Sequence, residues 1–157
     1  IVIIAFFDIL PAIDQDNRLR MKEAFSILMD YAIFAFIINL IREIVKDLED
    51  LDGDYQTGMN TLPIAIGIQK TKVIAGIVTV IAVLLLAYYL KTSLYELDYT
   101  IYYALIFIIG PLVYFGAKLS TAKVKKEFYH LSMVLKVVLF FGILSVAVIV
   151  LNLKYAK

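Results

Sequence analysis

Long runs of apolar residues alternate with short polar stretches along this chain of 157 residues. Three of the runs approach the length needed to cross a bilayer as a helix, about 20 mostly apolar residues. They are residues 73–90, 99–117 and 137–153. Residues 24–41 form a fourth such run, although Asp30 and Asn39 lie inside it. Residues 1–13 are also apolar but too few to span. The pattern predicts about four complete transmembrane helices and the end of a fifth.

The continuity of these runs favours helices over the strands of a membrane barrel. A barrel strand has about 10 residues that alternate between apolar and polar, whereas residues 81–90 are apolar without a break. We therefore expect an all-α, polytopic transmembrane bundle. Because the chain is already apolar at residue 1, we also expect residues 1–157 to be the C-terminal part of one larger membrane domain, with further helices before it.

Composition excludes several other classes of protein. The chain is 62% hydrophobic and 18% charged, against about 45–50% and 25% in soluble domains, so a water-soluble monomer is not expected. Its 15 basic and 14 acidic residues leave a net charge of +1, which gives no basic footprint for nucleic acid. The absence of Cys and the single histidine, His130, exclude thiol nucleophiles and sites built on several histidines.

The charges near the ends of the predicted spans indicate the orientation in the membrane. Lys and Arg are more frequent on the face that carries the connections 46–72 and 118–136 than on the opposite face. Because basic residues near span ends are retained on the inner side, we expect an integral protein of the cell's inner membrane with residues 46–72 in the cytoplasm. We interpret Lys70 and Lys72 as interfacial anchors.

The candidate chemistry lies where residues 24–41 pass into a dense group of acids. At about 100° per residue, a continuous helix would place five polar side chains on one stripe about 80° wide. They are Asn39, Glu43, Asp47, Asp50 and Asp54. Arg42 and Lys46 lie along one edge of the stripe and Asp52 lies on the other side. If Gly53 ends the helix, Asp54 leaves the stripe.

Two interpretations of this stripe remain open from the residues alone. Carboxylates at a membrane boundary are costly unless they are hydrated, paired or bound to metal. A row of oxygen ligands suits Mg²⁺ and substrate phosphates, and neighbouring cations can take the remaining phosphate oxygens. The alternative is a solvated helix end whose charges only mark the interface. The following stretch, with Gly58 and Pro63, predicts a loop that either caps a site or merely connects two spans.

A specific resemblance favours the first interpretation. The pattern R-E-I-V-K-D-L-E-D-L-D-G-D-x3-G-x2-T-L-P, which begins at Arg42, resembles the second aspartate-rich motif of the UbiA-type intramembrane prenyltransferases. It is most similar to the branch of the archaeal digeranylgeranylglyceryl phosphate synthases. Asp50 and Asp54 match the D-x3-D pair, and Asp47 matches the additional D-x2-D of that branch. The close match covers residues 42–67.

The resemblance implies a fold of nine transmembrane helices around a central cavity, with two aspartate motifs facing each other at its cytoplasmic end. It also implies transfer of a prenyl group, here of geranylgeranyl type, from an allylic diphosphate to an acceptor with Mg²⁺ as cofactor. The present motif would follow the sixth helix. The first motif, of the form N-D-x-x-D, has no counterpart in this sequence, so we expect residues 1–157 to hold half of the site and to be inactive alone.

The same resemblance implies a role for each residue of the stripe. The catalytic metal ligands would be Asp47, Asp50 and Asp54. Arg42 and Lys46 would bind the diphosphate. Asn39 and Glu43 would lie deeper, supporting those ligands or facing the acceptor. The implied partners are a prenyl diphosphate, a lipid or aromatic acceptor, membrane lipids and the N-terminal helices of the same protein.

Two other functions stay open beside prenyl transfer. A transporter or channel subunit would use the acids as a cation entry, which predicts ionisable groups continuing across the membrane. A noncatalytic remnant would retain the motif and bind prenyl lipid without turnover. Binding of prenyl diphosphate that depends on Mg²⁺ would separate an enzyme from a transporter, and turnover by the complete protein would separate an enzyme from a remnant.

Overall fold

Helices make up almost all of the described chain. The computed structural model describes residues 15–93 and 98–155, so the expected end of a helix at 1–13 lies outside the described residues. The helices are α2 (Gln15–Glu49), α3 (Leu51–Thr57), α4 (Leu62–Ile66), α5 (Ile68–Ser93), α6 (Asp98–Ala104), α7 (Gly110–Thr121) and α8 (Lys125–Tyr155). A π-helical segment, Leu105–Ile109, joins α6 to α7. No strand occurs in these two ranges.

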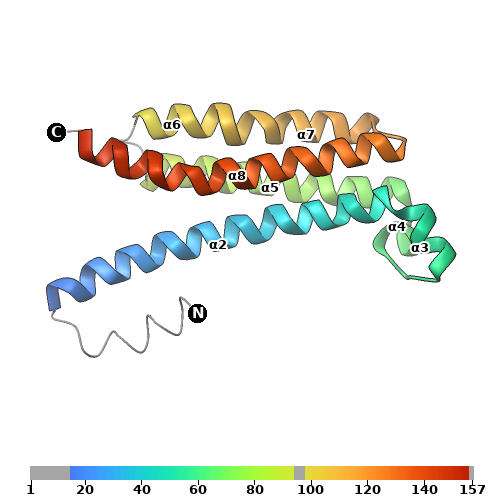
Figure 1. The fold of residues 1–157 in the computed structure, drawn as a ribbon, viewed down its shortest axis with the longest axis horizontal. Helices are drawn as coiled ribbons and strands as arrows, with labels where there is room; N and C mark the ends of the chain where they lie inside the picture. Colours follow the sequence, from blue (N-terminus) through green and yellow to red (C-terminus); the bar gives the residue numbers. More distant parts are fainter. Residues whose placement is uncertain (1–14, 94–97, 156–157) are drawn as a thin grey trace. The chain divides into compact units, whose positions relative to one another are not determined.

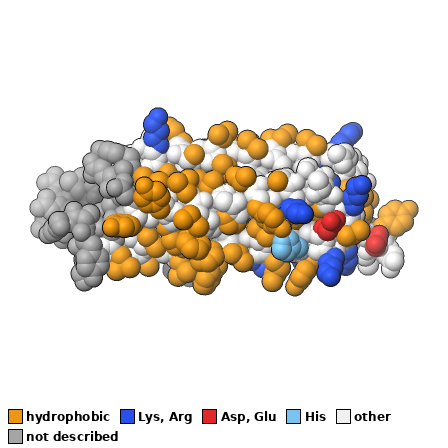
Figure 2. Space-filling view, turned by 90° about the horizontal axis from the view of Figure 1, so that it is seen from above, with side chains coloured by type: hydrophobic (Ala, Val, Ile, Leu, Met, Phe, Trp, Pro, Cys, Tyr) orange, Lys and Arg blue, Asp and Glu red, His pale blue; other side chains and the backbone are white. Residues whose placement is uncertain are grey.

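Four helical segments are long and apolar enough to cross a membrane, which confirms the predicted fold class. They are Phe25–Glu49, Ile68–Thr92, Tyr99–Thr121 and Lys125–Ile149. Large apolar side chains such as Leu84, Phe140 and Ile143 are well exposed along them, as expected where helices face lipid or further helices. Figure 2 shows hydrophobic side chains over the middle of the helices, whereas most charged side chains gather towards the end where the α7–α8 turn lies. The chain is an integral membrane protein.

The chain divides into two compact units, residues 1–34 and 35–157, and the boundary falls inside α2. The described part of the first unit is the beginning of α2, residues 15–34. The second unit contains the rest of α2, all the other helices and every residue of the candidate site.

The core of the second unit forms around α7. This helix packs against both α5 and α8, and α6 packs along α8 (Figure 1). The buried positions of α7 are Leu112, Phe115 and Leu119, and those of α8 include Leu131, Leu135 and Val138. Steps of three or four residues place each set on one face of its helix. The end of α2 repeats the pattern with Ile38, Ile41, Val45 and Leu48, so its polar stripe lies on a helix that also has a packed apolar face.

The α7–α8 turn is tied to α5 by Lys72. The Lys72 Nζ donates hydrogen bonds to the carbonyls of Ser120 (2.8 Å) and Ala122 (2.9 Å), and the residue is only 8% exposed. A cation there satisfies carbonyl groups at a helix C-terminus, where the helix itself offers no donors. The interpretation of Lys72 as an interfacial anchor is therefore wrong, whereas Lys70 is exposed as expected.

The third span changes its hydrogen bonding halfway, just before a proline. The Gly110 N–H donates to the carbonyl of Leu105, five residues earlier, as in a π-helix. Pro111 follows directly and has no N–H to continue the regular ladder. The segment as a whole still runs from Tyr99 to Thr121 as one candidate span.

Candidate metal and diphosphate site at the end of α2

The acidic stretch folds as two helices that meet at Asp50. Asp50 leaves the helical conformation, with φ −95° and ψ 8°, so the continuous helix assumed for residues 39–54 is interrupted there. The break satisfies its own backbone: the Asp50 N–H donates to the Lys46 carbonyl (2.9 Å), and the Asp50 carbonyl accepts from the N–H groups of Gly53 and Asp54 (2.9 and 3.0 Å). Gly53 lies inside α3, which ends instead at Gly58 with φ +70°.

Asp47 lies half-buried on the last turn of α2, near the next segment of the chain. The backbone N–H of Leu62, the first residue of α4, lies close enough to favour the charged form of its carboxylate. The first N–H groups of a helix have no partner within it, so a carboxylate is favoured next to them. The carboxylates of Asp54 and Glu43 are close enough to act on Asp47 electrostatically. The negative charges of two other members of the predicted stripe therefore act on Asp47.

Asp50 pairs with a residue of α8. Its Oδ1 lies 3.3 Å from Nζ of Lys125, at the start of α8. Within the ranges 15–93 and 98–155, no group of three acidic or histidine side chains could hold a metal ion by itself. Asp47 and Asp54 thus lie near each other, while Asp50 pairs with a cation.

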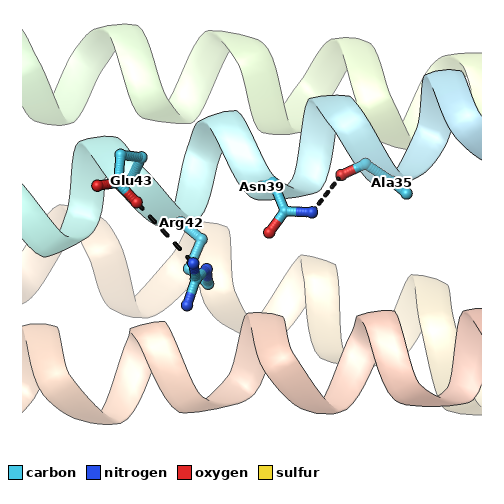
Figure 3. Close-up of polar contacts among 4 residues, drawn as sticks. All are labelled: Ala35, Asn39, Arg42 and Glu43. Atoms are coloured by element: carbon cyan, nitrogen blue, oxygen red, sulfur yellow. Dashed lines mark hydrogen bonds and ion pairs between the residues drawn. The ribbon is translucent and has the colours of Figure 1, made fainter.

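The deeper polar residues of the stripe make contacts along their own helix (Figure 3). The Asn39 side-chain amide donates to the carbonyl of Ala35 (3.0 Å). Arg42 lies 3.9 Å from the Glu43 carboxylate. Lys46, on the edge of the stripe, is exposed and acts electrostatically on Asp47. Glu43 is largely exposed and Arg42 is only 29% exposed, so the guanidinium is the partly desolvated member of this pair.

Two buried polar atoms beside the acids have no hydrogen-bond partner in the described part of the chain: Nε of Arg42 and Oγ1 of Thr61. A buried donor or acceptor left unpaired is costly, and the part of Arg42 that a ligand can reach is the exposed 29% of its side chain. An arginine N–H suits a phosphate oxygen, and carboxylate oxygens suit Mg²⁺. The residues present fit one side of a site for Mg²⁺ and a diphosphate.

An open cleft of about 680 Å³ lies beside the motif, between α3 and the start of α5. Asp52, the acid placed outside the predicted stripe, lines it together with Tyr55, Pro63 and Ile64. The cleft therefore adjoins the face of α3 that carries Asp52.

Sequence reasoning missed three groups at this site: Lys125, Thr61 and the N–H of Leu62. Thr61 and Leu62 belong to the quoted motif, but no role followed from their spacing. Lys125 lies 75 residues from Asp50, and no local pattern relates two residues so far apart. In the sequence, Lys125 stood out only as one of the basic residues counted in the connection 118–136.

The fold and the site together define a polytopic α-helical membrane protein with an aspartate-rich motif at the end of one span. A sequence model of the UbiA prenyltransferase family matches residues 21–135. The chain belongs to this family, as its motif indicated.

Three of the similar proteins are digeranylgeranylglyceryl phosphate synthases. The chain is 36% identical over 100 residues to the digeranylgeranylglyceryl phosphate synthase of Methanosphaera stadtmanae, covering 62% of this chain and 35% of that protein. It is 54% identical over 54 residues to that of Pyrococcus furiosus (32% and 20%) and 47% identical over 60 residues to that of Methanothrix thermoacetophila (38% and 22%). The chain thus spans about a third or less of the length of these relatives. No solved structure matches it.

Proposed function

We propose that residues 1–157 are the C-terminal part of a prenyltransferase that transfers a geranylgeranyl-type group from its allylic diphosphate to an acceptor inside the membrane. The proposal has this chain contribute the second aspartate motif, with Asp47, Asp50 and Asp54 as ligands of Mg²⁺. The remaining ligands would come from a first motif on the N-terminal helices. Family membership over residues 21–135 and the names of the relatives support it.

One observation carries the proposal: the negative charge of Asp54 acts on Asp47 at the end of α2, and Arg42, five residues before Asp47 on the same helix, keeps 29% of its side chain exposed. Carboxylates alone would suit many cations. A partly desolvated guanidinium nearby favours a ligand that also contains an anion. Mg²⁺ bound to a diphosphate has the cation that suits the carboxylates and the anion that suits the guanidinium.

Each residue then has a task in the reaction. When bound, Mg²⁺ would act as a Lewis acid that neutralises the leaving diphosphate. Asp47, whose carboxylate lies near the N–H of Leu62, would offer an oxygen to the cation. Arg42 and Lys46 bind phosphate oxygens, so that the C–O bond of the allylic carbon breaks next to positive charge. Asn39 and Glu43 lie deeper along α2 and face the acceptor or support the ligands.

The apolar spans have the other task, which is to exclude water. Breaking the allylic C–O bond leaves a carbon centre with positive character, and water would capture it before the acceptor. The exposed apolar surfaces, for example at Phe36 and Leu40 of α2, would pack against the N-terminal helices of the same protein and complete a dry cavity. Prenyl diphosphate would enter from the cytoplasmic side of the inner membrane, where the motif loop is proposed to lie.

The test uses the full-length protein in detergent or nanodiscs with geranylgeranyl diphosphate and two acceptors, a prenylated glycerol phosphate lipid and an aromatic quinone precursor. We expect product with Mg²⁺ and none with EDTA. Asp54→Asn should lower turnover at least about tenfold, as the loss of a metal ligand does. Asp52→Asn is the matched control, because Asp52 lines the cleft instead of adjoining Asp47, and it should stay within about twofold.

Three results would contradict the proposal. Product formed equally in EDTA would exclude the metal role, and equal turnover by Asp54→Asn and the wild type would exclude the motif. Cation flux through vesicles without any prenylated product would favour the transporter interpretation.

A further inference from the structure

In the described part of the chain, an ion pair between Lys125 and Asp50 joins the aspartate motif to α8. The Lys125 Nζ lies 3.3 Å from Asp50 Oδ1, and the two side chains are 67% and 41% exposed. An exposed pair of this kind contributes little to stability. Its position matters more, because the ammonium lies against an oxygen of a proposed metal ligand.

The backbone that carries Lys125 is held firmly, although its side chain is exposed. Lys72 binds the carbonyls of Ser120 and Ala122 just before the turn. Glu127 Oε2 accepts the N–H groups of Lys123 (2.7 Å) and Val124 (3.1 Å) immediately before Lys125. The turn is thus anchored from both sides, while the lysine has a long flexible stem and a compact charge that can change partners.

We propose that Lys125 is a positioning residue: it pairs with Asp50 while no metal is bound and turns to the diphosphate once Asp50 binds Mg²⁺. The inference rests on the proposed function. The ammonium and Mg²⁺ have the same sign and compete for the same carboxylate oxygen. The same ammonium attracts a diphosphate. Removal of Lys125 therefore has opposite effects on the two ligands.

These opposite effects distinguish positioning from a merely structural role. For Lys125→Gln, the metal alone should bind about two- to fivefold more tightly, the range set by an exposed ion pair. The KM for prenyl diphosphate should rise severalfold. A variant that only loosened the fold would weaken both. Lys125→Arg keeps the charge and should restore both values towards those of the wild type.

The experiment measures Mn²⁺ binding to the full-length protein by EPR without diphosphate, and the KM for geranylgeranyl diphosphate in parallel. Lys126→Gln is the matched control, since it removes the neighbouring exposed lysine and keeps the Asp50 ion pair. It should change the Mn²⁺ affinity less than Lys125→Gln does.

If the wild type binds Mn²⁺ and turns over, but Lys125→Gln leaves the Mn²⁺ affinity unchanged or lowers it, the inference is overturned and the proposed function stands. An equal gain in Mn²⁺ affinity in Lys126→Gln also overturns it, because the effect would then be one of general charge. A wild type that neither binds Mn²⁺ nor forms product overturns both proposals.

Discussion

The buried lysine at the start of α5 offers a direct test of how the site is held in place. Lys72→Met keeps a side chain of similar length but removes the ammonium that binds the carbonyls of Ser120 and Ala122. Both carbonyls lie at the end of α7, and the bond to Ala122 is fully buried. We expect the substitution to destabilise the protein, because those carbonyls lose their donor in a place that water reaches poorly.

The size of the loss follows from the two bonds. Hydrogen bonds to a charged group are worth about 1.5–3 kcal/mol each, so two of them set an upper limit of roughly 3–6 kcal/mol. Two effects reduce it: Met no longer has a charge to bury, and the Ser120 carbonyl is only partly buried. We therefore expect a decrease in the unfolding free energy of about 2 kcal/mol. For a domain of 150–250 residues this lowers the Tm by roughly 4–8 °C.

The measurement is unfolding of the full-length protein in detergent, with Lys70→Met as the matched control. Lys70 lies two residues earlier on the same helix and is exposed, so its loss should change stability by less than about 0.5 kcal/mol. Equal stability of Lys72→Met and Lys70→Met would refute the reasoning, because the two hydrogen bonds would then contribute nothing.

Two further substitutions separate binding chemistry from folding. Asp47→Asn keeps an oxygen near the N–H of Leu62 and removes the repulsion from Asp54 and Glu43. Thermal unfolding should therefore show equal or higher stability in EDTA, while turnover should fall at least about tenfold. A loss of both stability and turnover would indicate a structural role. Gly58→Ala places a side chain at φ +70° and should cost roughly 1–2 kcal/mol of unfolding free energy. Gly53→Ala, inside α3 with open space around it, should cost nothing, and equal stability of the two variants would contradict the argument from φ.

The spans could be predicted from the sequence because one physical requirement determines them. About 20 apolar residues in a row are needed to cross a bilayer as a helix, and each of the four predicted runs overlaps one of the four candidate spans. The ends were less predictable. The first span extends to Glu49 rather than residue 41. The charged residues Arg, Glu and Lys that follow residue 41 continue a helix about as readily as Leu or Met does.

In the candidate site, contacts between residues close in the sequence could be predicted, whereas contacts between distant residues could not. The effect of Glu43 on Asp47 follows from helical spacing, because the two lie four residues apart on α2, whereas Asp54 acts on Asp47 across the break at Asp50. Gly53 was the one candidate for a helix end that the sequence analysis considered, whereas the break lies at Asp50, a residue type preferred at the start of a helix, and Gly58 provides the end of α3. The contacts of Lys125 and Lys72 join residues 48 to 75 positions apart, and tertiary packing alone creates them.

The break at Asp50 also bears on how a metal would bind under the proposed function. An unbroken helix would collect five polar side chains on one stripe, and its carboxylates would repel one another whenever no cation was present. The break instead leaves Asp47 on α2 beside α4, while Asp50 pairs with the first residue of α8. The ammonium of Lys125 offsets part of the negative charge at Asp50, and by competing for the same oxygen it lowers the affinity of the motif for a metal alone. Tight binding would then need the diphosphate and the acids of a first motif, so that the cation and the prenyl donor enter the site together.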